Sequence, residues 1–515
     1  MESFSALLAC SVVVLMTIHV LYMLHKQKRT RASGGACLPP GPSGHPFLGN
    51  LLYALQTLRH NPHRELASLA RTYGPVASLQ LGLSRAVVVV SSPAAAHEAL
   101  IKNDAALAAR LVPDTMHALS YSTTSMVFLP STNQLWRQHR AMVGARFATG
   151  RGLDAILPVL ERHACRLAEY LGTQSGRPVA VREVVNRTVL NVVSNLLFSE
   201  DVVDMSVEEG AHRFQGIIPL VLADWSRSSV SDAFPFLAPI DHLLGSHRRI
   251  SMNLAKLFKF FDDDIIGPRL LANTSEEHDD VLDFLLARHA ESKITRQEIT
   301  TFLTDMFVVA TDTSTVTVQR ALAQLLRLPE KMEKVNAELA ACLGSSDFVR
   351  ESDLYNLPYL QAVVKETLRL YPAAPLISRE VVSDGVSLGG FPVPNGTGVI
   401  VNLWAIGRDP KAWPYQPEEF VPERFLAGHP AHYPQGIDAF AYRPFGAGRR
   451  VCPGMDYTMR SVPLLLASLL HKTKWNLPDG MAPEDMDLRD RYGTVLDLAT
   501  PFHAVPVKSM TAHNI

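Results

Sequence analysis

The chain has 515 residues, 47% of them hydrophobic, and is therefore long enough to bury a large apolar core. Its 49 basic and 50 acidic side chains give a formal net charge of −1, so no bulk attraction to nucleic acid is expected and we predict no nucleic-acid partner. The cysteines form no Cys-x-x-Cys pair, which argues against a disulfide framework or a cysteine zinc site and favours a reducing compartment: Cys10, Cys37, Cys165, Cys342 and Cys452.

The N-terminal segment from Phe4 to Leu24 is almost wholly apolar. Its length of about 21 residues, at a helical rise of about 1.5 Å each, is sufficient to span the hydrocarbon core of a bilayer. The alternative is a cleaved signal peptide, but the run is long for one, and its basic cluster follows the run instead of preceding it. The charge bias places the rest of the chain in the cytosol, so residues 1–31 are predicted to be an uncleaved signal-anchor helix in membrane lipid, with its basic flank.

Residues 32–46 are predicted to be a Pro/Gly-rich hinge, with four prolines between Pro39 and Pro46. Proline fixes φ and lacks an amide N–H, so these residues stop the membrane helix and stiffen the spacer that orients the C-terminal part of the chain on the membrane. No convincing linker divides the remainder, and residues 47–515 are expected to form one large domain.

This domain is predicted to be mainly α with small β-sheets. Helical spacing of apolar residues and the positions of prolines indicate the helices. Short β-branched or alternating runs, broken by glycine turns, indicate the strands. One expected helix begins at Pro93, and the others cover 136–198, Phe302–Leu328, Pro358–Leu370 and Met455–His471. The expected strand regions are Ser78–Val90, with a turn at Gly82, and Val386–Trp404, with turns at Gly389-Gly390 and Asn395-Gly396.

One cysteine, Cys452, lies in a loop rich in glycine and arginine that runs from Phe445 to Gly454. Glycines let the backbone fold closely around a sulfur atom and direct N–H groups at it. The nearby arginines and the start of the helix after the loop favour the ionised thiol. Cys452 in this loop is therefore a candidate thiolate ligand of iron.

Two pairs of residues lie on single faces of predicted helices. Glu366 and Arg369 stand at i, i+3, where an ordinary surface ion pair contributes less than about 1 kcal/mol, but Arg424 offers a second arginine shortly before the cysteine loop and indicates a structural triad. Trp136 and Arg140 stand at i, i+4. An aromatic ring and a guanidinium on one face suit the carboxylates of a flat cofactor, or else simply anchor the helix.

The helix expected over Phe302–Leu328 contains Ala310-Thr311-Asp312-Thr313-Ser314 after an apolar run. A carboxylate and hydroxyls in mid-helix are unfavourable unless they cap a helix or perform chemistry. One interpretation is an N-cap at Asp312 or Thr313 that splits the run into two helices. The other is a kink at which Asp312 and Thr313 relay protons.

In this combination the chain resembles the cytochrome P-450 superfamily of haem-thiolate monooxygenases, along essentially its whole length beyond the anchor. The cysteine loop matches the family signature F-x-x-G-x-R-x-C-x-G at Phe445, Gly448, Arg450, Cys452 and Gly454. The family's E-x-x-R pair and the arginine that completes its triad are matched by Glu366, Arg369 and Arg424. The W-x-x-x-R motif is matched by Trp136 and Arg140. The resemblance implies a single large cytochrome P-450 fold behind the transmembrane helix.

The resemblance also implies a role for each matched residue. Cys452 would be the axial ligand of the iron in haem b, with Phe445 in the same loop. The haem propionates would be held by Trp136, Arg140, Arg379 and Arg450. Asp312 and Thr313 would deliver protons to bound O2, and electrons would come from NADPH through NADPH–cytochrome P-450 reductase, docked on the cysteine side.

Two departures from the family pattern fall in the long helix. The usual [AG]-G-x-[DE]-T-[TS] begins here with Val309-Ala310, so alanine replaces the glycine over the haem. The extra methyl leaves less room, but the acid and the alcohol remain, and we expect oxygen activation to survive. Gln319-Arg320 stands where Glu-Trp is common. Both departures bear on efficiency or substrate more than on reaction type.

Within the superfamily the chain is most similar to plant microsomal enzymes of the geraniol 8-hydroxylase-like group. The motifs that carry this similarity are Leu38-Pro39-Pro40-Gly41-Pro42, Ser229–Pro235 with Pro239-Ile240-Asp241, and Asn402–Pro410. It implies hydroxylation of a small lipophilic metabolite, a monoterpenoid or diterpenoid, by a single-pass protein of the endoplasmic reticulum membrane whose catalytic domain faces the cytosol. Candidate walls of the substrate pocket, mainly apolar, are Val309, Ala310, Leu376, Ile377, Thr494 and Val495.

Three other functions stay open. The first is an oxygenase whose substrate is a phenolic, a fatty acid or a xenobiotic. The second is an oxygen-independent haem-thiolate isomerase or dehydratase, against which the retained Asp312 and Thr313 and the anchor argue. The third is a non-enzymatic, membrane-anchored haem-binding sensor, which the complete set of motifs disfavours.

Overall fold

The computed structural model describes Thr17 and residues 38–45, 48–58, 61–82, 85–147, 149–204, 216–225, 229–234, 241, 243–271, 280–428 and 440–508. Apart from Thr17, the predicted anchor lies outside these residues. Within the described part of the chain, no helix combines the length and the apolar character that crossing a bilayer requires. The prediction of an anchor at 1–31 is therefore not tested by the structure.

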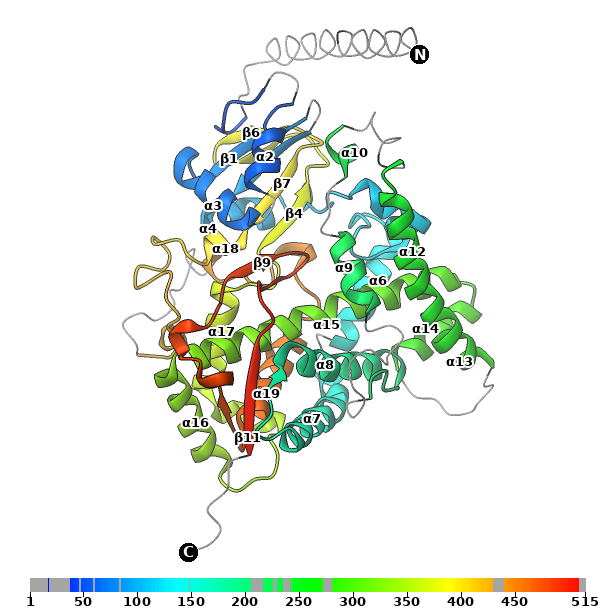
Figure 1. Cartoon of the computed structure of the whole chain (residues 1–515). Helices are drawn as coiled ribbons and strands as arrows, with labels where there is room; N and C mark the ends of the chain where they lie inside the picture. Colours follow the sequence, from blue (N-terminus) through cyan, green and yellow to red (C-terminus); the bar gives the residue numbers. More distant parts are fainter. Residues whose placement is uncertain are drawn as a thin grey trace, which may run out of the picture.

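A long helix, α15 (Arg296–Arg327), runs through the middle of the molecule (Figure 1). It begins at a capping box, in which Thr295 accepts the N–H of Glu298 and the Glu298 carboxylate accepts the N–H of Thr295. This cap starts the helix six residues before the predicted Phe302. Almost all of its side chains are buried, because other helices cover it on several sides.

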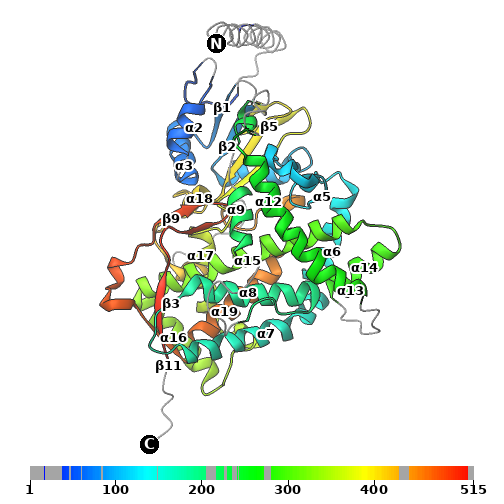
Figure 2. The same ribbon diagram turned by 45° about the vertical axis from the view of Figure 1, so that its right-hand side comes forward.

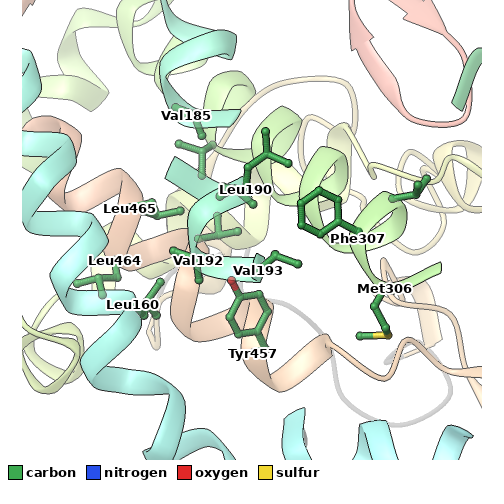
Figure 3. Packing of buried hydrophobic residues seen from close by; sticks show 14 of the residues in the cluster. Leu160, Val185, Leu190, Val192, Val193, Met306, Phe307, Tyr457, Leu464 and Leu465 are labelled. Carbon is green, nitrogen blue, oxygen red and sulfur yellow. The ribbon is translucent and has the colours of Figure 1, made fainter. Parts of the chain in front are cut away.

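Helices α7 (Gly150–Thr173) and α8 (Val181–Phe198) lie on one side of α15, and α9 (Ile217–Trp225) and α12 (Ser246–Lys259) lie on the other (Figures 1 and 2). The apolar spacing of 136–198 resolves into α7, α8 and α6 (Gln134–Phe147). Figure 3 shows aliphatic side chains of α7 and α8 packed with Phe307 of α15 and Tyr457 of α19 (Met455–Leu470) in the principal core. The core thus holds α15 rigidly against its neighbours.

The first predicted strand region meets the C-terminal part of the second in one sheet of order β1-β2-β7-β4, whereas the N-terminal part of the second forms a separate two-stranded sheet and β4 lies outside both predicted regions. Strands β1 (Val76–Leu81) and β2 (Arg85–Val90) form the expected hairpin around Gly82, which adopts a positive φ. Strand β7 (Gly398–Asn402) pairs in parallel with β2 and antiparallel with β4 (Leu376–Glu380). Only tertiary pairing joins these segments, which are about 300 residues apart.

A separate two-stranded unit, β9 (Asp490–Tyr492) with β10 (Leu496–Leu498), lies close to α15. We call residues 490–498 the β9–β10 hairpin. The remaining strands are β3 (Val179–Ala180), β5 (Val386–Leu388), β6 (Phe391–Val393), β8 (Thr473–Asn476) and β11 (His503–Lys508). The remaining α-helices are α2 (Leu51–Thr57), α3 (Pro62–Tyr73), α4 (Pro93–His97), α5 (Tyr121–Thr124), α10 (Val230–Ala233), α13 (Gly267–Leu271), α14 (Val281–Ala290), α16 (Pro329–Leu343), α17 (Pro358–Leu370) and α18 (Leu403–Ile406).

The prediction of mainly helical structure with small sheets is confirmed, and α17 has the predicted bounds. One alternative is wrong: α15 continues as a single α-helix through Asp312 and Thr313, so neither residue is an N-cap. The hydroxyls in this stretch donate to carbonyl oxygens four residues earlier, as Thr313 Oγ1 does to Val309 O at 2.9 Å. These bonds satisfy the polar side chains within the helix, so it does not need to end.

Candidate functional site

Glu366 and Arg369 lie inside the protein, not on a helix surface. Both side chains are fully buried, and the Arg369 guanidinium donates twice to the Glu366 carboxylate, at 2.7 and 2.8 Å. Arg424 Nε donates to the same carboxylate at 3.0 Å. The two arginines also donate to backbone carbonyls of 407–419, such as Pro417 O at 2.7 Å and Tyr415 O at 3.0 Å. The triad therefore fastens the irregular segment that precedes the cysteine loop.

The cysteine loop depends on two glycines with positive φ, Gly446 and Gly448. At Gly448 a Cβ atom would lie 2.3 Å from Leu100 O, so no other residue fits without moving the backbone. The Cys452 amide donates to Phe445 O at 3.0 Å and closes the loop just before α19 begins at Met455. The chain thereby presents the thiol ahead of a helix N-terminus, as the spacing predicts.

The electrostatics of Cys452 differ from the expectation. Burial raises the pKa of the Cys452 thiol, and the amide of Gly454 with the cations Arg140 and Arg110 offsets only part of this rise. The adjacent Arg449 does not face the sulfur but is paired with Asp104 at 2.7 Å. The protein environment alone therefore disfavours the thiolate, and a bound cation such as iron would favour it.

Helix α6 docks directly onto the cysteine loop. Arg140 Nη2 donates to Val451 O at 2.5 Å, next to the cysteine. The Arg450 guanidinium lies 5.1 Å from the centre of the buried Trp136 ring and donates to the backbone carbonyls of Ala108 and Leu129. The predicted pair Trp136–Arg140 and the cysteine-loop residues Arg450 and Cys452 thus come from different parts of the chain and form one structural unit.

Arginines crowd together beside this unit, and none of the carboxylates in the described part of the chain forms an ion pair with Arg110, Arg379 or Arg450. Arg379 is buried, and its pKa is lowered well below the usual range by desolvation and by the nearby Arg110 and Arg450. Among the described residues, Arg110 Nε is buried without a hydrogen-bond partner. Such an excess of buried positive charge calls for an anion. Two propionates beside the Cys452 thiol would satisfy it, so the residues fit a haem.

Arg110 was missed by sequence reasoning. It lies in an irregular segment before η2 (Asp114–Ser120), without periodicity or a recognisable spacing. Burial lowers the pKa of Arg110, and Asp305 on α15, which lies far from it in the chain, opposes this shift. No local pattern marks the residue, and only the fold places it beside Arg379 and Arg450.

The acid and the alcohol of α15 have different surroundings. Asp312 is almost fully buried and forms an ion pair with Arg182 in the first turn of α8. Desolvation raises the pKa of Asp312, while the Arg182 guanidinium opposes the rise. Thr313 is half-buried and donates to Val309 O. Arg182 is a second residue that sequence reasoning missed, because its role arises only where α8 crosses α15.

The predicted walls of the substrate pocket come from three elements. Val309 and Ala310 are half-buried on α15, and Leu376 and Ile377 are half-buried on β4. Ile377 approaches the cysteine loop, since a Cβ atom at Gly446 would lie 3.1 Å from its Cδ1.

The turn of the β9–β10 hairpin carries the remaining two wall residues. Thr494 Oγ1 donates to Leu222 O of α9 at 2.5 Å, and Val495 is buried. The structure therefore places the ends of α9 and of the hairpin in contact.

A buried carboxylate one turn and a half before Ala310 fastens the segment that contains α5. Asp305 accepts the hydroxyls of Tyr121 at 2.5 Å and of Ser125 at 2.8 and 2.9 Å. Burial raises the pKa of Asp305 to about 6, although these hydroxyls and the amides of 126–127 oppose the rise. This contact holds the segment around α5 against α15.

Comparison with known proteins agrees with this geometry. A family model described as Cytochrome P450 matches residues 39–501. Over 497 residues the chain is 44% identical to oryzalexin E synthase of Oryza sativa subsp. japonica, covering 94% of this chain and 95% of the relative. It is 41% identical to ent-cassadiene C11-alpha-hydroxylase 1 of the same organism, covering 96% and 97%. It is 38% identical to geraniol 8-hydroxylase of Catharanthus roseus, covering 91% and 94%.

The family model spans the arginine cluster, α15, the buried triad and the cysteine loop, and the similarity to these relatives extends over more than nine-tenths of the chain. The chain belongs to the cytochrome P450 family and is a cytochrome P450 monooxygenase.

Proposed function

We propose that this enzyme hydroxylates a small lipophilic terpenoid, either a monoterpenoid or a diterpenoid. The observation that carries the proposal is similarity over at least nine-tenths of the chain to a hydroxylase of geraniol and a hydroxylase of ent-cassadiene. The mainly apolar walls on α15, β4 and the β9–β10 hairpin support it, because a hydrocarbon skeleton gains binding energy from apolar contact.

Family membership implies haem b, O2 and electrons from NADPH through a reductase. Cys452 would hold the iron, and the propionates would lie among Trp136, Arg140, Arg379 and Arg450, with Arg110 added by the fold. When bound, the haem supplies the oxidising chemistry, while the protein supplies orientation and protons.

Proton delivery is assigned in this proposal to Asp312 and Thr313. The Thr313 hydroxyl donates to Val309 O at 2.9 Å and is free to rotate its proton away from this carbonyl. Asp312 replaces that proton from the solvent side, where its partner Arg182 is partly exposed. Ala310 lies on the same helix, one turn before Ser314, and carries one methyl group more than the usual glycine. This methyl group narrows the space beside Thr313 and so restricts how close a substrate approaches Thr313.

The proposal also places the enzyme in the cell. The signal-anchor at 1–31 holds it as a single-pass protein in the membrane of the endoplasmic reticulum, with the catalytic domain in the cytosol. NADPH–cytochrome P-450 reductase, itself membrane-bound, docks on the cysteine side of the domain. A lipophilic substrate then reaches the enzyme from the membrane lipid.

The chemistry is tested first by the reduced, CO-bound difference spectrum of the full-length enzyme. A Soret band near ~450 nm is expected from thiolate ligation, and Cys452→Ser should abolish it. A wild-type spectrum without this band would refute haem-thiolate chemistry altogether.

The substrate is tested with microsomes that contain the enzyme and a reductase. A panel of terpenoids that includes geraniol and ent-cassadiene is incubated with NADPH, and products are identified by mass spectrometry. We expect addition of one oxygen atom to at least one terpenoid. Turnover of a phenolic or a fatty acid alone would overturn the substrate class and leave the chemistry intact, and turnover without NADPH would favour an isomerase or dehydratase.

A further inference from the structure

One guanidinium connects two carboxylates that belong to different working parts of the enzyme. Arg182 Nη2 is paired with Asp312 Oδ1 of α15, and Arg182 Nε donates to Asp497 Oδ2 of β10 at 3.0 Å. Both carboxylates are nearly buried, with side-chain exposures of 8% and 7%. Among the described side chains, Arg182 is the one that hydrogen-bonds the Asp312 carboxylate. The position of the acid therefore depends on this arginine.

The other end of this link is a hairpin that reaches the predicted substrate pocket. The turn between β9 and β10 carries Thr494 and Val495, and Thr494 Oγ1 donates to Leu222 O of α9. Arg320 of α15 fixes the base of the hairpin, since it donates to Leu488 O at 2.8 Å and to Asp490 Oδ1 at 2.9 Å. Between base and turn, Asp497 binds Arg182 through its side chain.

Arg320 is itself one of the two departures from the family pattern. It is buried, its guanidinium lies 4.4 Å from the centre of the Tyr371 ring, and it also donates to Asp497 O at 3.3 Å. With Arg320 at the base and Arg182 at the side, the β9–β10 hairpin is tied to α15 by charged groups on both strands. These contacts supply a direct physical connection between the hairpin and α15.

We propose that Arg182 is a positioning residue that couples the β9–β10 hairpin to the acid Asp312. A substrate that orders the turn at Thr494 and Val495 seats Asp497 against Arg182, and Arg182 then holds Asp312 in place for proton delivery. The inference rests on the proposed function, because it takes Asp312 as the proton donor. It adds a route by which occupancy of the pocket controls that donor.

The planar guanidinium is suited to this role, because its Nε and Nη2 face two carboxylates at once in a fixed geometry. A lysine at position 182 keeps the charge as a point and does not hold both partners in the same way. The Arg182→Lys variant is therefore expected to restore part of what Arg182→Gln loses.

The first test is hydrogen exchange of backbone amides in the full-length, haem-loaded enzyme, which does not depend on turnover. Asp312→Asn lies on α15, outside the hairpin, but is expected to raise exchange of the hairpin amides by about threefold or more, as coupled sites do. In an Arg182→Gln background the same substitution should add nothing. The matched control is Arg491→Gln: Arg491 also binds Asp497, at 3.1 Å, but is 65% exposed, and the effect of Asp312→Asn should persist there.

The second test is the fraction of consumed NADPH that appears as oxygenated product, measured with and without saturating substrate. Arg182→Gln and Asp497→Asn are both expected to lower this fraction several-fold, and Arg182→Lys to recover part of it. The double variant Arg182→Gln, Asp312→Asn should be no worse than Asp312→Asn alone, because the two residues act in one path.

The outcomes separate the inference from the proposed function. Hairpin exchange that ignores Asp312→Asn, in an enzyme that still hydroxylates a terpenoid, would overturn the coupling alone. A coupled hairpin in an enzyme that hydroxylates no terpenoid would overturn the substrate class and leave the coupling in place. Retention of the Soret band in every variant shows that the domain remains folded around its haem.

Discussion

At the scale of single residues, two acidic side chains of α15 are buried in different environments. Asp312 is paired with a cation, whereas Asp305 is surrounded by hydroxyl and amide donors. A cation favours ionisation, and hydroxyl donors do so only weakly, so desolvation dominates at Asp305 and raises its pKa to about 6. The difference makes Asp305 a group that titrates near the pH of ordinary assays.

The raised pKa of Asp305 predicts that the stability of the protein depends on pH. Since its native pKa is about 6 and its ordinary value is 3.8, the native chain binds more protons than the unfolded chain between these values. The contribution of Asp305 to stability therefore rises as the pH falls through about 6 towards 4. Relative to Asp305→Asn, the wild type should gain roughly 1 to 3 kcal/mol between pH 7.5 and pH 4.5.

Urea unfolding of the wild type and of Asp305→Asn at both pH values measures this gain. Any loss of hydrogen bonds to Tyr121 and Ser125 in the variant is the same at both pH values and cancels in the comparison. A stability difference that does not change with pH would show that Asp305 is ionised throughout the range.

Arg110 predicts an effect on haem retention. Its Nε is buried without a hydrogen-bond partner among the described residues, and the neighbouring Arg379 and Arg450 repel it, so an anion should gain from all three. Arg110→Gln is expected to weaken haem binding by about tenfold or more, as the loss of a hydrogen bond to a charged group does. Haem content after transfer to apomyoglobin gives the rate of loss.

The control for Arg110 is Arg449→Gln. Arg449 is 41% exposed and paired with Asp104 at 2.7 Å, so its removal should leave haem retention unchanged. Equal haem loss in both variants would mean that general destabilisation, and not an anion site, explains the result.

At the scale of elements, the buried triad connects α17 to the irregular segment before the cysteine loop. Glu366→Gln leaves two buried arginines without their carboxylate and is expected to lower the free energy of unfolding by about 3 to 5 kcal/mol. Chemical denaturation of the holoenzyme measures this loss.

A neighbouring Arg–Glu pair provides the comparison for Glu366→Gln. Glu418 is 66% exposed and binds Arg408 at 3.0 Å, so Glu418→Gln should cost less than about 1 kcal/mol. A similar loss of unfolding free energy in the two variants would contradict this interpretation, in which the triad stabilises the protein strongly because it is buried and not simply because its charges are paired.

At the scale of the whole molecule, the described residues from 38 onwards supply an extensive apolar core of their own. A chain that starts at residue 32 is therefore expected to fold, to bind haem and to show the ~450 nm band. It should also pass largely from the membrane pellet to the supernatant on centrifugation, because about 21 apolar residues have been removed. A truncated chain that still pellets entirely would place the principal membrane contact in the catalytic domain.

Much of the site follows from local patterns. Cys452 is identified by the glycines that its loop requires, and Gly448 indeed admits no Cβ atom. Trp136 with Arg140, and Glu366 with Arg369, are identified because helical spacing places them on one face. The bounds of α17 follow from Pro358 and Pro372, which start and stop the helix.

Other features have no local pattern. Whether Asp312 and Thr313 cap a helix or lie within one depends on packing around α15 and on hydroxyl bonds to its carbonyls, which spacing alone does not decide. The thiol pKa of Cys452 depends on the balance between burial and the distant Arg140 and Arg110. Neighbouring arginines in the sequence indicated the opposite direction.

The motifs of the chain were sufficient to indicate its family, to predict Cys452 as its iron ligand and to predict the order of its helices, because backbone constraints and helical periodicity are local in the sequence. Only the folded chain shows that Arg110 lies beside Arg379 and Arg450, that Asp305 binds the hydroxyls of Tyr121 and Ser125, and that Arg182 links Asp312 to the β9–β10 hairpin. These contacts join residues 130 or more positions apart, or groups whose charge depends on burial. Desolvation and long-range pairing arise only when the elements pack, so no local pattern can encode them.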